Sequence, residues 1–123
     1  MGFLLDTNFL LIPGNYKVDV FRELQMFGKQ EFYTSDLVLK ELENLSSGKG
    51  QPAIAARLAL QLITMKGVKI LASKGKNTDK SIEDLALERN YTVCTQDKEL
   101  IKRLKGKKMK VISLRQKRYL VEI

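Results

Sequence analysis

The chain of 123 residues is 44% hydrophobic and 29% charged, a composition that predicts one folded domain over residues 1–123 and excludes a disordered chain. Its single cysteine and its lack of histidine exclude a disulfide framework, a Ser-His-Asp triad and a histidine-ligated metal. The formal net charge is +8, and residues 101–123 hold this whole excess with nine basic residues and one acid, which favours a polyanionic partner over a merely solvated surface.

Short apolar or β-branched runs alternate with longer amphipathic stretches along the chain. The predicted elements are, in order, a strand at 2–5, a turn at Pro13-Gly14, a helix over 18–27, a strand at 31–34, a helix after Ser35, a helix over 52–65, a strand at 68–71, a helix over 79–89, a strand at 91–95, a helix over 97–105, and a strand at 109–114. Residues 115–123 are left open between a further strand and a packed tail.

This alternation predicts an α/β protein. Strands separated by single helices imply right-handed β-α-β crossovers, and hence a mainly parallel sheet of about five strands with helices on both faces. No apolar run approaches the roughly 18 residues of a membrane helix, so no membrane partner is expected. Asp6 interrupts the apolar N-terminus, which argues against a signal peptide and for a cytoplasmic protein.

Four acids are predicted to reach one edge of this sheet. Asp6 follows the first strand, Asp97 follows the fourth, and Asp79 opens the helix after the third. Glu41 lies one residue from the helix face of Val38, Leu42 and Leu45, which we expect to be buried. Each acid alone has a structural alternative, since Asp79 and Asp97 could cap helices and Glu41 could be exposed, but four at one edge favour a shared function.

Clustered carboxylates repel one another unless cations neutralise them, and hard divalent ions such as Mg²⁺ prefer oxygen ligands. A carboxylate cluster beside a basic surface therefore predicts a metal-dependent phosphodiesterase with one or two ions. Four polar residues beside the acids could orient ligands or contact a phosphate, with turn and cap chemistry as an equal alternative: Thr7, Asn8, Ser35 and Thr95.

The C-terminal basic segment is the predicted nucleic-acid-binding part of the chain. Its candidate phosphate-binding residues are Lys102, Arg103, Lys105, Lys107, Lys108, Arg115, Lys117 and Arg118. Tyr119 lies among them and is the candidate for stacking on an unpaired base, whereas Tyr33 and Tyr91 fall in predicted strands and are expected to pack in the core.

At this point the sequence resembles the PIN domains. The matching pieces are Leu4-Leu5-Asp6-Thr7-Asn8, Val38-Leu39-Lys40-Glu41-Leu42, Asp79-Lys80-Ser81-Ile82 and Thr95-Gln96-Asp97-Lys98-Glu99-Leu100. Their order and spacing cover nearly the whole chain. The resemblance implies a Rossmann-like three-layer α/β/α sandwich and a Mg²⁺- or Mn²⁺-dependent endoribonuclease for single-stranded RNA, with Asp6, Glu41, Asp79 and Asp97 as its acidic catalytic and metal-binding quartet.

Two branches of the family compete. VapC-type toxins pair with an antitoxin, whereas archaeal nucleases similar to Fcf1/Utp24 process rRNA precursors, and the basic run and the residues around it look more like the second branch. Lys80 departs from that branch, which often carries an acid there, and would either weaken metal binding or contact a phosphate. A processing-complex subunit, a homodimer and a catalytically silent RNA-binding module stay open as further interpretations.

Overall fold

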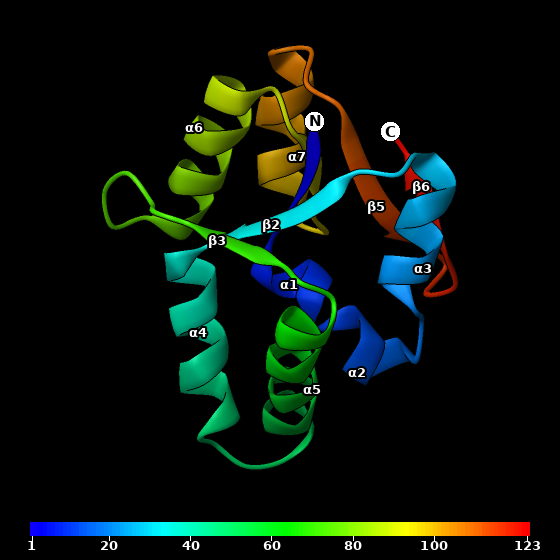
Figure 1. The fold of residues 1–123 in the computed structure, drawn as a ribbon, viewed down its shortest axis with the longest axis vertical. Helices are drawn as coiled ribbons and strands as arrows, with labels where there is room; N and C mark the ends of the chain where they lie inside the picture. Colours follow the sequence, from blue (N-terminus) through cyan, green and yellow to red (C-terminus); the bar gives the residue numbers. More distant parts are fainter.

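The computed structural model describes residues 1–123, which form one six-stranded sheet with helices on both faces (Figure 1). The strands are β1 (Gly2–Leu5), β2 (Glu31–Ser35), β3 (Lys69–Leu71), β4 (Thr92–Cys94), β5 (Val111–Arg115) and β6 (Tyr119–Glu122). The helices are α1 (Thr7–Leu10), α2 (Ile12–Tyr16), α3 (Val20–Leu24), α4 (Asp36–Ser46), α5 (Gln51–Met65), α6 (Thr78–Arg89) and α7 (Lys98–Gly106), with a 3₁₀ turn over Gln25–Phe27.

The strand order is β3-β2-β1-β4-β5-β6, with β1 to β5 parallel and β6 antiparallel to β5. In Figure 1, α6 and α7 lie on one side of the sheet and α1, α4 and α5 on the other, which confirms the predicted three-layer α/β/α class. The chain passes from β1 outward to β3 and then returns to place β4 on the other side of β1. Ligands of open α/β sheets bind at the carboxyl ends of the strands where the order reverses in this way, here between β1 and β4.

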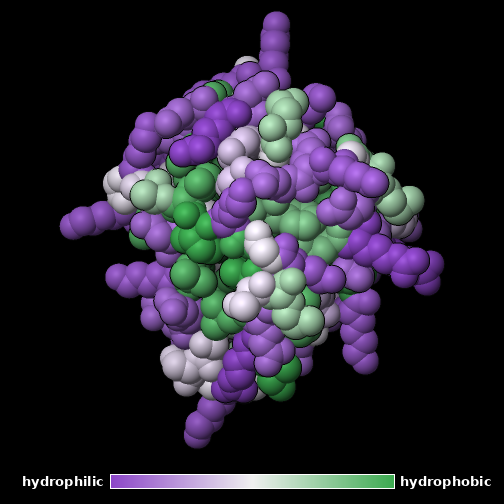
Figure 2. Space-filling model, viewed as in Figure 1, coloured by the Kyte–Doolittle hydropathy of each residue, from purple (hydrophilic) through white to green (hydrophobic).

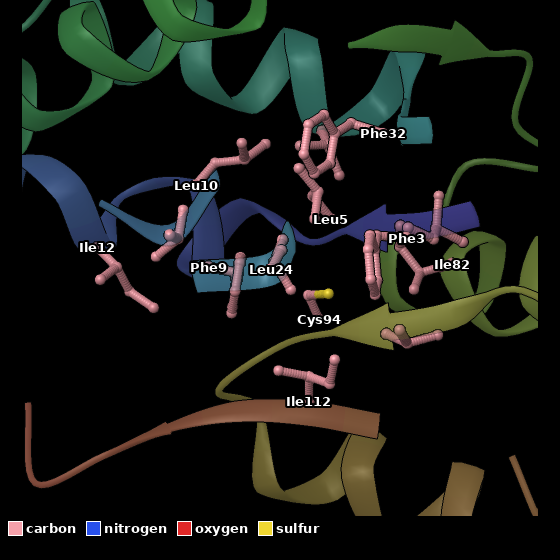
Figure 3. Packing of buried hydrophobic residues seen from close by; sticks show 14 of the residues in the cluster. Phe3, Leu5, Phe9, Leu10, Ile12, Leu24, Phe32, Ile82, Cys94 and Ile112 are labelled. Carbon is pink, nitrogen blue, oxygen red and sulfur yellow. The ribbon is translucent and has the colours of Figure 1, made fainter. Parts of the chain in front are cut away.

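The core lies on both sides of the central strands. All four residues of β1 are buried, because β2 and β4 flank the strand and helices cover both of its faces. Figure 3 shows side chains of β1, β4 and β5 gathered with those of α1 and α3, among them Leu5, Cys94, Ile112, Phe9 and Leu24. This packing holds the carboxyl ends of the central strands in place, where the candidate acids follow.

Three expectations need correction. Pro13 and Gly14 do not form a separate turn but lie in α2, where proline is accepted because the first turn of a helix lacks hydrogen-bond partners for its N–H groups. The helix expected over 18–27 is shorter, with Asp19 capping α3 and a 3₁₀ turn after it. Leu45 is 37% exposed rather than buried, while Val38 and Leu42 are buried as predicted.

The C-terminal tail forms the sixth strand, which pairs with β5 through Ile112 to Arg115. At the other edge β3 has no outer neighbour, and Figure 2 shows hydrophobic side chains around the place where Figure 1 draws β3, within a largely hydrophilic face.

Gly14 lets α2 approach α5 closely, since a Cβ there would lie 2.5 Å from the Cα of Ala55. None of the helices has the length and apolar character required to cross a membrane.

Candidate active site

Asp6 follows β1 directly and is buried, with 3% of its surface exposed. The Thr7 backbone N–H donates to its Oδ1 at 2.8 Å, and the Thr95 hydroxyl donates to its Oδ2 at 2.8 Å. Burial raises the pKa of Asp6 from 3.8 to about 6 against the lowering effect of these two hydrogen bonds, and the charges of Asp79 and Glu41 raise it further. The fold therefore holds a carboxylate where its negative charge is unfavourable, an effect that a bound cation would oppose.

Thr95 joins the ends of the two central strands. Its side chain is fully buried, donates to Asp6 and accepts the Asp97 backbone N–H at 3.1 Å. Beside it, the Asn8 Oδ1 accepts the Gln96 backbone N–H at 2.9 Å, and the Gln96 side chain bonds in turn to β5. Thr95 and Asn8 thus lie beside Asp6 as predicted, and they fix the loop that carries Asp97.

Asp79 and Asp97 come from different helices but lie next to each other. Asp97 is the N-cap of α7, and its Oδ1 accepts two backbone N–H groups of that helix at 3.0 and 3.2 Å. Asp79 lies in the first turn of α6, whose N-cap is Asn77, so the capping alternative applies to Asp97 only. Burial raises the pKa of Asp79, and the charge of Asp97 and a hydrogen bond with it raise this pKa further.

Glu41 is exposed but is held by two hydroxyl groups. The Thr7 hydroxyl donates to its Oε1 at 2.5 Å and the Thr78 hydroxyl donates to its Oε2 at 2.8 Å. Because Thr7 is on α1 and Thr78 opens α6, this pair of hydrogen bonds orients Glu41 over the edge of the sheet. The predicted role of Thr7 as a neighbour of the acids agrees with this contact, whereas Thr78 was missed, although it directly precedes Asp79.

Ser35 is placed differently from the other three polar candidates. It is buried at the end of β2, and its hydroxyl accepts the Val38 backbone N–H at 3.2 Å as the N-cap of α4. The hydrogen bond of the Ser35 side chain is therefore with the backbone of α4 and not with the acids.

The four acids fit a hard divalent ion in donor type, because they offer only carboxylate oxygens. Asp79 and Glu41 each raise the pKa of Asp6, and Asp97 raises that of Asp79, so their charges interact at one edge of the sheet. No three of these acids converge on one point at ligating distance in the structure. Binding of an ion by three of them would therefore draw their side chains inward.

The predicted RNA-binding residues come from two parts of the fold that pack together, α7 with the residues after it and the β5–β6 hairpin. Lys102, Arg103 and Lys105 are on α7, Lys107 and Lys108 follow it, and Arg115, Lys117, Arg118 and Tyr119 are on the β5–β6 hairpin. The Lys117 ammonium lies 5.5 Å from the ring centre of Tyr16, and Tyr119 is 41% exposed. Tyr33 and Tyr91 instead stack on each other, with ring centres 4.6 Å apart.

Two cations of this set bind a buried acid that the sequence analysis did not single out. The Glu83 carboxylate is 3% exposed and accepts from Arg103 at 3.2 Å and from Lys107 at 2.7 Å. These contacts lower the pKa of Glu83, that with Lys107 most. A signal was present, because Glu83 lies four residues after Asp79 on α6 and therefore shares its helix face.

Residues 3–117 match the family described as "PIN like domain". The chain belongs to the PIN domain family. Ribonuclease VapC4 of Methanocaldococcus jannaschii is 32% identical to this PIN domain in an alignment of 120 residues that covers 93% of this chain and 90% of that protein. The resemblance read from four short motifs is thereby confirmed across almost the whole length.

Solved structures agree with this assignment. The PIN domain endonuclease Utp24 superposes with a TM-score of 0.80 and 26% identity, over 97% of this chain and 88% of its own. VapBC-1 of nontypeable Haemophilus influenzae superposes with a TM-score of 0.61 and 19% identity, over 86% of this chain and 94% of its own, and shows the same fold. Both branches weighed from the sequence are thus among the relatives.

Proposed function

We propose that this PIN domain is a divalent-metal-dependent endoribonuclease that cleaves single-stranded RNA. The carrying observation is the buried Asp6 carboxylate at the reversal of strand order, with Asp79 and Glu41 close enough for their charges to raise its pKa. The relative named as a ribonuclease and the endonuclease of similar structure support this reaction.

Each residue of the site has a role in this proposal. Asp6, Glu41, Asp79 and Asp97 would hold one or two Mg²⁺ or Mn²⁺ ions. When bound, such an ion supplies positive charge for the phosphoryl oxygens and makes the attacking water more acidic.

The neighbouring polar residues orient these acids. Thr95 orients one oxygen of Asp6, and Thr7 and Thr78 orient both oxygens of Glu41. The Oδ1 of Asn8 is used by the Gln96 backbone N–H, so its amide nitrogen is left to donate to a phosphate oxygen.

The test is cleavage of a labelled single-stranded RNA in Mn²⁺, Mg²⁺ or EDTA. We expect wild type to cut only with the ion, and Asp6→Asn and Asp97→Asn to lose cleavage. Glu43→Gln is the matched control, because Glu43 is an exposed acid on α4, two positions from Glu41, and its side chain makes no hydrogen bond or ion pair in the structure. If the RNA stays intact under every condition but still binds, the proposed nuclease activity is refuted and the alternative of a catalytically silent RNA-binding module is supported.

The biological role has two candidates within this reaction. The identity to VapC4 favours a toxin ribonuclease with an antitoxin partner, whereas the structural similarity to Utp24 favours an rRNA-processing nuclease in a complex. We propose the second, with an rRNA precursor as substrate and the cytoplasm as location. Affinity purification from the native cell distinguishes the roles, since co-purification of a small antitoxin would refute rRNA processing and co-purification of preribosomal RNA would support it. The same sample run by size-exclusion chromatography tests the homodimer that the sequence left open.

A further inference from the structure

A polar hollow of about 700 Å³ lies between α6 and α7, beside the candidate active site. No hydrophobic residue lines it. Its lining residues are Asn77, Asp79, Lys80, Glu83, Arg103, Gly106 and Lys107. Asp79 belongs to both the hollow and the acidic cluster, so the two sites are continuous.

Glu83 binds Arg103 of α7 and Lys107, the residue that follows this helix, at the hollow. Its carboxylate is almost fully buried, while the side chains of Arg103 and Lys107 are 42% and 45% exposed. Two cations on one buried anion leave a net positive charge that faces the open space. Since an exposed lysine or arginine normally samples many rotamers, the buried partner restricts both side chains to the wall of the hollow.

The contacts with Glu83 use few of the available donors. Arg103 donates to Glu83 through Nε, and neither of its two terminal nitrogens has a protein partner in the structure. A guanidinium carries five N–H donors in a planar fork and an ammonium carries three, so most donors of this pair remain for a ligand. Phosphate oxygens are the ligand that such a fork matches best.

A third cation borders the same space. Lys80 is exposed, pairs loosely with Asp84 at 3.3 Å on its own helix and lines the hollow. The charge of Arg103 lowers the pKa of Asp79, whereas burial and the neighbouring acids raise it, so the cationic wall lies within electrostatic reach of the cluster. A chain with regularly spaced negative charges could therefore occupy both sites together.

We propose that this hollow is a subsite for one backbone phosphate of the RNA strand, bound by Arg103 and Lys107 and flanking the phosphate at the acidic cluster. Glu83 is the positioning residue of the subsite. The inference rests on the proposed function for its substrate, and it assigns Lys80 to the rim of the same subsite rather than to the metal site.

The experiment measures RNA binding without cleavage. A fluorescent oligouridylate is titrated in EDTA at several salt concentrations, and binding is followed by anisotropy. For single strands, each neutralised phosphate contributes about 0.7 to the slope of log K against log salt. We expect the double variant Arg103→Gln with Lys107→Gln to reduce this slope by about 0.7, which is one phosphate, and to bind about tenfold more weakly at the lowest salt.

The control removes the same charge elsewhere. The double variant Lys29→Gln with Lys66→Gln changes two exposed lysines that form no ion pairs. They precede β2 and β3, at the amino ends of these strands, whereas the candidate acids follow the carboxyl ends. We expect this control to keep the wild-type slope. Equal losses in both double variants would overturn the subsite, because they would show a diffuse attraction, and so would absence of measurable binding by wild type.

Glu83→Gln separates positioning from bulk charge. This variant makes the protein more positive, so diffuse attraction predicts stronger RNA binding and an unchanged or steeper slope. A positioning role predicts a shallower slope in a protein whose circular dichroism matches wild type. Stronger binding with an unchanged slope would overturn the role of Glu83.

The outcomes separate this inference from the proposed nuclease activity. Metal-dependent cleavage with no slope difference between the two double variants would refute the subsite and leave the nuclease. A slope difference without cleavage by any variant would refute the nuclease and support the subsite as part of an RNA-binding module.

Discussion

Replacement of Asp6 by asparagine is expected to stabilise the metal-free protein while it removes cleavage. Burial raises the pKa of Asp6 from 3.8 to about 6, and one pKa unit corresponds to about 1.4 kcal/mol, so the ionised carboxylate lowers the free energy of unfolding by about 3 kcal/mol. Asparagine keeps the shape without the charge but weakens the hydrogen bond with Thr95, at about 1 kcal/mol. The net gain is about 2 kcal/mol at pH 8, or about 8 °C in Tm for a chain of this length.

The pH dependence gives the sign of this effect. Between about pH 4 and pH 6 the folded protein keeps a proton on Asp6 that the unfolded chain has released, so wild-type stability falls as pH rises through this window. Asp6→Asn has no such proton and lacks this fall. The stability gap should therefore be near its full size at pH 8 and vanish or reverse below pH 4.

Urea denaturation at pH 4 and pH 8 in EDTA measures the gap, with Glu43→Gln as the control that should differ from wild type by less than about 0.5 kcal/mol. Addition of Mn²⁺ at pH 8 should raise the Tm of wild type, because the ion binds the native state, and leave the Tm of Asp6→Asn unchanged. An Asp6→Asn variant less stable than wild type by the same amount at both pH values would refute the reasoning, since the cap that Asp6 provides for α1 would then outweigh the cost of its buried charge.

Three further substitutions test contacts that the structure shows. Thr95→Val removes the hydroxyl that donates to Asp6, so it should cost about 1–3 kcal/mol at pH 8 in urea denaturation and less below pH 4. Ser35→Ala should cost about 1 kcal/mol of unfolding free energy by loss of the α4 cap and leave RNA cleavage within about twofold of wild type; a large loss of cleavage would return Ser35 to the site. Gly14→Ala places a methyl group 2.5 Å from the Cα of Ala55, so thermal unfolding should show a loss of about 1–3 kcal/mol, and a neutral result would contradict the close approach of α2 and α5.

The strands and helices of the sheet could be predicted from the sequence, because the patterns that indicate them are local. The apolar run at residues 2–5 needs no distant partner to predict a buried strand, and β1 is buried throughout. Alternation of strands and helices then fixes parallel pairing and puts the strand ends at one edge. The shorter α3 and the helical Pro13 departed from expectation, because spacing alone does not place a helix boundary and Pro13 fits a first turn as well as a loop.

Within the site, the sequence by itself determined which acids could meet, since Asp6 and Asp97 follow strands that the fold makes neighbours. Only the tertiary structure decided their environment: how deeply Asp6 is buried, that Thr95 and not Ser35 bonds to it, and that Thr78 holds Glu41. The same holds for Glu83. In the sequence it is one acid among several with no sign of burial, and in the structure it is buried beside α7 and pairs with Arg103 and Lys107. Burial and ion pairing depend on which elements pack against each other. These elements are far apart in the sequence, so a local pattern of residues does not show which of them will meet.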